Sequence, residues 1–404
     1  MIRRPERNIP VWGEYDVIVC GGGIAGVAAA LAAARSGVKT CLIEKYAGLG
    51  GLATLGLIVV YLPLCDGRGR QVSFGIAEEL LKAPMKYSSC KPKGAWHSKD
   101  SATREELAEK RYELVFDPGP MALALERLVC DAGVELVYDS VIVDVIRNYE
   151  GAITHLVLEN KSGCGALAAK TVIDCTGDAD ICHMCGESVE VYPDNTRSAW
   201  YYAIDEDRRI SLELAVDYWS EEKTSDKPRF DGTDWRQVTA QIVESRKYII
   251  ERLAADNRKR SEKGQVELSS FYVPFFHSFR MTRHLVSDYV ITSDDVHRWH
   301  NDAVGIFPDW RKAGRVYSLP LRSILAVNTP NLAAAGRCIS ASGDSWDVTR
   351  VIPVCAVSGE AAGIVTAMAA SDGCALRSVP VEKVQKELKA RGVLLDKALV
   401  ENGD

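Results

Sequence analysis

The stretch YDVIVCGGGIAG, residues 15–26, joins a short apolar run to closely spaced glycines. Its first six residues are mostly β-branched or aromatic, a pattern that predicts a buried strand. Gly21, Gly23 and Gly26 then fit the spacing G-x-G-x-x-G. In that motif the first glycine allows a tight turn, the second lets the backbone approach a pyrophosphate, and the third lets the next helix pack closely. The alanine-rich segment that follows predicts such a helix, whose amino-terminal amides would face the phosphates.

The next segment supports a dinucleotide site. The helix is expected to end near Gly37, and VKTCLIE (38–44) predicts a second strand that ends on Glu44. Glu44 follows the glycines by about 20 residues, where a carboxylate can bond both hydroxyls of a ribose and would repel a 2′-phosphate. Asp16 and three glycines interrupt the apolar run, which argues against a membrane span. The pattern therefore favours a dinucleotide-binding βαβ unit over a purely structural one.

Length and composition narrow the class of protein. The chain has 404 residues, 47% apolar and 26% charged, with a formal net charge of −6. This length predicts two domains, or one large domain with an insertion. No run of Lys and Arg forms a nucleic-acid footprint, and no apolar signal region precedes Pro10, so we expect neither a nucleic-acid nor a membrane partner. The 12 cysteines show no framework spacing, which predicts reduced thiols and a cytoplasmic location.

Further motifs extend this interpretation along the chain. They are GLGGLAT (48–54), TVIDCTGDAD (171–180), RMTRHLVSDYVIT (280–292), NLAAAGRCISAS (331–342) and RVIPVCAVSGEAAG (350–363). Together with GGGIAG they resemble the FAD-dependent oxidoreductases whose FAD domain is of the glutathione reductase type. The similarity is greatest to the branch of the succinate dehydrogenase and fumarate reductase flavoproteins, and to bacterial proteins called simply FAD-dependent oxidoreductases. It covers about residues 15–370 and implies that the dinucleotide is FAD.

The resemblance implies an α/β fold. A Rossmann-like FAD-binding domain, with a parallel sheet and a β-meander, is expected to be split by an inserted α+β domain that caps the substrate. The expected parts are residues 1–190 and 316–380 for the FAD-binding domain, 191–315 for the cap domain, and 381–404 for a helical carboxyl-terminal tail.

The resemblance also implies which residues hold the cofactor. They surround the pyrophosphate, the adenosine, the route to the flavin, and the flavin pyrimidine edge: Gly21, Gly23, Ile24, Ala25, Gly26, Glu44, Lys45, Gly50, Gly51, Thr54, Val141, Thr176, Gly177, Asp178, Gly336, Arg337 and Pro353. Pro353 would begin a helix whose amino terminus stabilises negative charge on the reduced flavin.

Candidate catalytic residues follow from what hydride transfer needs. The donor carbon must lie ~3–3.5 Å from the flavin, a group must handle the proton, and developing charge must be neutralised. The segment SSFYVPFFHSFRMTRH (269–284) offers His277, Arg280, Arg283 and His284, and Tyr61 is a weaker candidate. The alternative for the arginines is an ion pair that ties the cap to the FAD domain, and the alternative for Tyr61 is packing.

Cys182 and Cys185 form a CxxC motif. Such a pair is typical of a redox disulfide or of half a metal site, but no second CxxC follows at zinc spacing. We therefore favour two small apolar side chains in a helix, and expect no metal.

The sequence thus predicts an FAD-dependent enzyme that carries out a two-electron, hydride-transfer reaction on a small organic substrate held between the cap and the isoalloxazine. Two alternatives stay open: a flavin-dependent monooxygenase, and a non-catalytic FAD-binding protein. The G-x-G-x-x-G motif occurs once, so no second domain for NAD(P)H is expected. The partners left open are a separate electron acceptor and a second copy of the chain.

Overall fold

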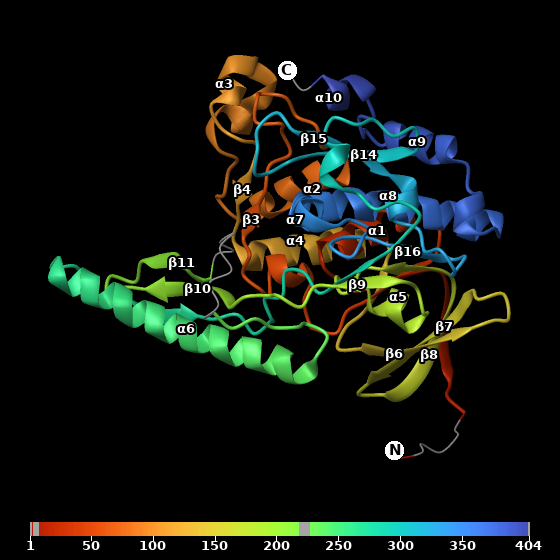
Figure 1. Ribbon diagram of the computed structural model, residues 1–404, viewed down its shortest axis with the longest axis horizontal. Coiled ribbons are helices and arrows are strands. Elements are labelled where there is room, and N and C mark those ends of the chain that lie inside the picture. Colours follow the sequence, from red (N-terminus) through yellow and green to blue (C-terminus); the bar gives the residue numbers. More distant parts are fainter. Residues whose placement is uncertain (1, 3–7, 218–226, 403–404) are drawn as a thin grey trace.

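The computed structural model describes residues 2, 8–217 and 227–402, so most of the segment before Pro10 lies outside the described residues. The seven-stranded mixed sheet has the order β5-β2-β1-β8-β7-β6, and β16 also pairs with β8 (Figure 1). Its strands are β1 (Val11–Cys20), β2 (Thr40–Ile43), β5 (Glu135–Val137), β6 (Val141–Arg147), β7 (Ile153–Asn160), β8 (Gly163–Asp174) and β16 (Leu332–Ala334).

The pairing in this sheet has two parts. β1 pairs in parallel with β2 and β8, β2 with β5, and β16 with β8. β6, β7 and β8 pair antiparallel, as a meander. The predicted α/β class, with a parallel sheet and a meander, is confirmed.

Two helices of small residues pack against each other beside the sheet. They are α1 (Ile24–Ala34) and α8 (Ile352–Asp372). A Cβ atom on Gly359 would lie 2.3 Å from the carbonyl oxygen of Ala25, and one on Gly363 would lie 2.3 Å from that of Ala29. Only glycine therefore allows these backbones to approach so closely. α8 is long and apolar enough to cross a membrane, but 83% of its apolar window is buried, as in a core helix.

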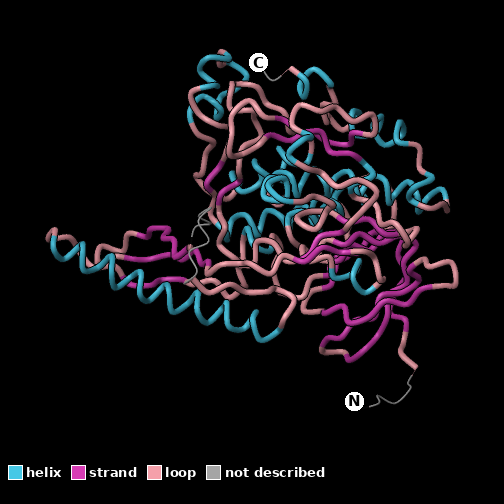
Figure 2. The backbone as a smooth tube through the Cα atoms, in the orientation of Figure 1, coloured by secondary structure: helices cyan, strands magenta, loops and turns pink. Residues whose placement is uncertain are grey.

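A second region extends away from this core, as Figures 1 and 2 show. It contains a three-stranded antiparallel sheet with the order β11-β10-β12 and the 28-residue helix α6. We call these elements the arm: β10 (Ser198–Ile204), β11 (Ile210–Val216), α6 (Trp235–Glu262) and β12 (Ser269–Tyr272). A small separate core of Ala199, Tyr201, Ala203, Ala215 and Ile249 joins its sheet to its helix.

Short elements complete the described chain. The pairs are β3 (Val60–Tyr61) with β4 (Leu114–Val115), β9 (Val189–Val191) with β13 (Arg283–Leu285), and β14 (Ala303–Pro308) with β15 (Val316–Pro320). The other helices are α2 (Ile76–Lys82), α3 (Arg104–Ala108), α4 (Pro118–Asp131), α5 (Asp180–Met184), α7 (Gly343–Thr349), α9 (Val381–Ala390) and α10 (Lys397–Glu401). β14 packs against α8. The division of the chain into domains stays a prediction.

Candidate functional site

A cavity of about 240 Å³ lies at the carboxyl ends of β1, β2 and β8, where ligands of open α/β sheets usually bind. Thirteen of the residues expected to hold the cofactor line it: Gly21, Gly23, Ile24, Ala25, Glu44, Lys45, Gly50, Gly51, Val141, Thr176, Gly177, Gly336 and Arg337. These residues come from segments up to 316 positions apart in the sequence, from Gly21 to Arg337, and the fold brings them to one place.

Two of the expected residues that do not line the cavity shape its loops. A Cβ atom on Gly26 would lie 1.8 Å from the carbonyl oxygen of Gly21, so the turn before α1 requires glycine there. Gly21 itself has φ +106°, and a Cβ atom on it would lie 2.5 Å from the carbonyl oxygen of Cys175. The Thr54 hydroxyl donates to the carbonyl of Leu49 at 2.5 Å and closes the second glycine turn.

Glu44 organises one end of the cavity. One carboxylate oxygen accepts from the Gly22 amide at 2.6 Å, and the other accepts from the Tyr46 amide at 2.9 Å. Burial raises the pKa of Glu44, against the effect of these amides. A carboxylate has about four lone-pair sites, so Glu44 can still accept bonds from a ribose.

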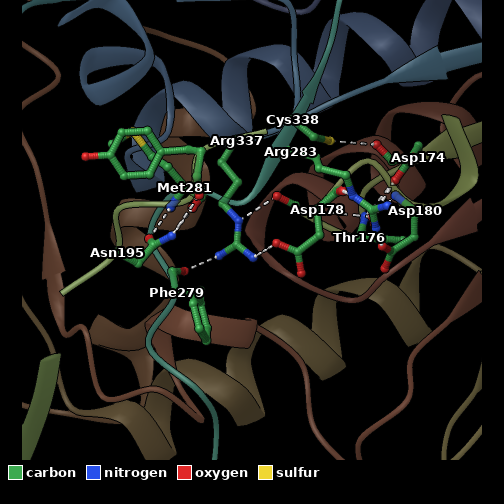
Figure 3. Close-up of polar contacts among 12 residues, drawn as sticks. Asp174, Thr176, Asp178, Asp180, Asn195, Phe279, Met281, Arg283, Arg337 and Cys338 are labelled. Carbon is green, nitrogen blue, oxygen red and sulfur yellow. Dashed lines mark hydrogen bonds and ion pairs between the residues drawn. The ribbon is translucent and has the colours of Figure 1, made fainter. Parts of the chain in front are cut away.

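Arg337 joins three segments around the cavity, as Figure 3 shows. Its Nε donates to the carbonyl of Gly177 at 2.6 Å, and its Nη2 pairs with the Asp178 carboxylate at 2.5 Å. Its Nη1 donates to the carbonyl of Phe279 at 2.9 Å. Burial alone would raise the pKa of Asp178, but the positive charge of Arg337 lowers it, so the carboxylate stays ionised. Asp178, expected to contact the cofactor, instead holds Arg337.

Arg283 makes a second link of the same kind. Its Nε donates to the carbonyl of Asp178 at 3.0 Å, and its Nη2 pairs with the Asp180 carboxylate at 2.5 Å. Burial and the charge of Asp178 raise the pKa of Asp180 to about 6, although Arg283 acts in the opposite direction. Asp180 lines the cavity and Arg283 does not. These contacts of Arg283 match the alternative in which it forms an ion pair that ties the cap to the FAD domain.

The other candidates from residues 269–284 also lie outside the cavity lining. Burial lowers the pKa of His277 to about 4, so it is neutral near pH 7. The His277 Nδ1 has no hydrogen-bond partner among the described residues. His284 is fully buried, with Nδ1 2.9 Å from the carbonyl of Leu285 and its ring 4.5 Å from that of Trp346. Arg280 donates from Nη2 to the Ser198 hydroxyl at 3.4 Å.

Tyr61 is a core side chain. It is fully buried, and its hydroxyl donates to the carbonyl of Ala77 at 2.7 Å. Burial raises its pKa well above the ordinary value. Because this hydroxyl is already bonded away from the cavity, its placement matches the packing alternative.

The CxxC cysteines lie in and directly after α5. Both thiols are free and buried, and burial raises the pKa of each. The amide of Cys182 donates to the Asp174 carboxylate at 2.9 Å. No group of three or more His, Cys, Asp or Glu residues able to hold a metal ion occurs among the described residues.

The far end of the cavity is formed by the start of α8, with Arg350, Ile352 and Cys355 in its lining. The expected residue Pro353 lies between them in the first helical turn. Val351, at the amino-terminal cap, makes no side-chain capping bond. The Arg350 Nε is buried without a hydrogen-bond partner among the described residues, while its Nη2 pairs with Asp347. The Arg350 guanidinium and the amino terminus of α8 therefore both contribute positive potential at this end of the cavity.

The sequence analysis missed several lining residues, including Arg350, Phe276, Met184 and Asp180. Arg350 opens the last motif and lies two residues before α8, so its position in the sequence could have indicated a role at the site. Phe276 had no such signal, because it is one of several aromatic residues in its segment.

Comparisons with known proteins agree with this geometry. A family model described as FAD dependent oxidoreductase matches residues 16–275 and 192–388. Dihydrolipoyl dehydrogenase of Trypanosoma brucei brucei is 49% identical over 46 residues, which are 11% of this chain and only 10% of that protein.

Solved structures that match the chain include a geranylgeranyl bacteriochlorophyll reductase-like protein from Thermoplasma acidophilum, with a TM-score of 0.49 and 17% identity over 96% of this chain and 90% of that one. A flavocytochrome c3 fumarate reductase has a TM-score of 0.42 and 14% identity over 89% and 79%. The p-nitrophenol 4-monooxygenase PnpA from Pseudomonas putida DLL-E4 has a TM-score of 0.48 and 10% identity over 97% and 90%.

Proposed function

The chain belongs to the FAD-dependent oxidoreductase family and binds FAD, and we propose that it is a dehydrogenase or reductase that transfers a hydride between the flavin and a small organic substrate. The substrate would lie at the α8 end of the cavity, with the arm as part of the cap. A cytoplasmic location and a separate electron acceptor belong to the same proposal.

The residues present fit FAD. A Cβ atom on Gly21 or Gly26 would collide with the loop, which fits the tight turn and the close helix packing of a dinucleotide motif, and a Cβ atom on Gly23 would meet nothing within 4 Å, which leaves open backbone for a pyrophosphate. Glu44 sets the adenosine end, and the start of α8 sets the flavin end. When bound, FAD supplies the ability to accept or give two electrons.

The observation that carries the proposal is the Arg350 Nε, which is buried in the cavity wall beside the open amides of α8 and has no hydrogen-bond partner within the described part of the chain. A guanidinium and a helix amino terminus both stabilise negative charge, and a water-poor site strengthens that effect. A flavin bound at this end of the cavity would carry additional negative charge in its reduced state, which these groups would stabilise. Arg350 and the α8 amides would therefore favour flavin reduction by a substrate.

The test uses Arg350→Met, with Arg283→Met as the matched control, because each removes one partly buried guanidinium. Arg350→Met should keep FAD and lower its midpoint potential by about 30–60 mV, which corresponds to one lost charge-assisted hydrogen bond. Arg283→Met should leave the potential unchanged. Equal midpoint potentials of the flavin in the wild type and in Arg350→Met would contradict the proposal that Arg350 stabilises negative charge on the flavin.

The reaction class is tested by adding candidate donors without oxygen and following the flavin absorption band. Bleaching by an alcohol, amine or organic acid supports the proposal. Bleaching by NAD(P)H, followed by substrate hydroxylation in air, would favour the monooxygenase alternative. A protein that keeps stoichiometric FAD but is reduced by no donor would favour the non-catalytic alternative.

A further inference from the structure

We propose that Phe276 is a cofactor-binding residue that covers the adenosine half of FAD. Phe276 belongs to the segment between β12 and β13, which connects the arm to the cofactor-binding core. It lines the same cavity as Glu44 and Gly21, although 232 and 255 residues separate it from them in the sequence. This inference does not depend on the reaction proposed above.

The contacts of Phe276 place it at one end of the cavity. Its ring centroid lies 5.0 Å from that of Tyr46, whose amide is bonded to Glu44. The Lys45 ammonium lies 6.0 Å from the Phe276 centroid and 5.5 Å from the Tyr46 centroid. Because Glu44 is expected to accept hydrogen bonds from the adenosine ribose, we take this as the adenosine end and the α8 end as the flavin end.

Several contacts fix the position of the segment that carries Phe276. Arg337 donates to the carbonyl of Phe279, three residues further along, at 2.9 Å. Phe279 is 1% exposed. The ring centroid of His277 lies 4.7 Å from that of Phe276 and 5.7 Å from that of Phe279. The link from Arg337 to the segment therefore also holds Phe276 in position.

The chemistry suits a purine base. Every base presents a π-face to which an aromatic side chain can stack, and replacing such a side chain by alanine weakens binding measurably. Lys45, at the rim of the same aromatic pair, adds a positive charge near the ribose and phosphates. We expect Phe276 to recognise the adenosine half by its flat surface, and to contribute nothing at the flavin.

The experiment compares FAD with ADP, which shares the adenosine half and lacks the flavin, on the apoprotein by calorimetry. Phe276→Ala should raise the Kd of both ligands by about 10- to 100-fold. Phe276→Trp should restore binding, and the midpoint potential of the remaining flavin should not change. Phe275→Ala is the control: Phe275 is the preceding residue, is 72% exposed and does not line the cavity, so both Kd values should stay within about twofold.

Three outcomes would overturn the inference. They are unchanged or tighter binding of FAD by Phe276→Ala, a loss of FAD affinity without a loss of ADP affinity, and no binding of ADP to the wild-type apoprotein. Phe276→Leu keeps apolar volume without an aromatic face. If Phe276→Ala is too unstable to titrate, weakened ADP binding by Phe276→Leu supports the inference and unchanged binding overturns it.

Discussion

The cofactor-binding core and the arm specify their structures in different ways. In the core, single backbone positions decide the geometry: a Cβ atom on Gly26 would lie 1.8 Å from a carbonyl oxygen, and one on Gly359 would lie 2.3 Å from another. In the arm, a small apolar core joins a sheet to a helix, while Trp235 and Ile250 on α6 are each 69% exposed. This difference shows where the role of a single residue can be predicted from the sequence. It can be predicted where any side chain larger than glycine would collide with the backbone, and it cannot be predicted where many different side chains would pack equally well.

The largest effect should come from breaking the core at a glycine. In Gly26→Ala, the new methyl group must displace the Gly21 backbone, so we expect a loss of about 3 kcal/mol or more in the free energy of unfolding and no FAD retention. Chemical denaturation and FAD occupancy measure both effects. Gly23→Ala is the matched control, because a Cβ atom there meets nothing within 4 Å and Gly23 itself lines the cavity. It should weaken FAD binding without destabilising the apoprotein.

A loss of stability of the same order should come from an ion pair beside the cavity. Arg337→Met leaves the buried Asp178 carboxylate without its ion-pair partner, which typically costs 3–5 kcal/mol. In the wild type the pKa of Asp178 is lowered, so its contribution is present above the unfolded pKa and is lost as pH falls. In the variant that pKa should rise. Denaturation should therefore show a larger deficit at pH 8 than at pH 5.

Arg283→Met provides the comparison for that measurement. The side chain of its partner Asp180 is 36% exposed, so water can replace the guanidinium, and we expect a loss of about 1 kcal/mol or less. Equal deficits in the two variants would contradict the distinction between a buried and a partly exposed link.

The smallest effect should come from the arm surface. Ile250→Ser should change the free energy of unfolding by less than about 0.5 kcal/mol and leave the FAD affinity unaltered, because the side chain is mostly in water. A large loss of stability would show that a partner covers this face of α6. Ile249→Ser, which alters the buried neighbour, should be far more harmful.

The dinucleotide site could be predicted from the sequence because the glycine spacing and the position of Glu44 are dictated by local backbone geometry, whereas FAD and the fold class followed from the resemblance of the further motifs to a known family. Thirteen of the expected residues line the cavity. The roles in the segment 269–284 could not be predicted in the same way. Arg283 lies 103 residues from Asp180, and whether it pairs there or faces a substrate depends on how distant segments meet. Phe276 was missed for the same reason.

The contact between α1 and α8 has a consequence for how the chain acquires its structure. The two helices lie more than 300 residues apart in sequence, and β16 also joins the sheet late. During synthesis, the alanine-rich surface of α1 therefore stays exposed while the whole arm is synthesised. Non-local closure of this kind slows folding and leaves apolar surface open to aggregation. We expect FAD to bind at the last step of folding, because residues 350–355, which line the flavin end of the cavity, are synthesised late.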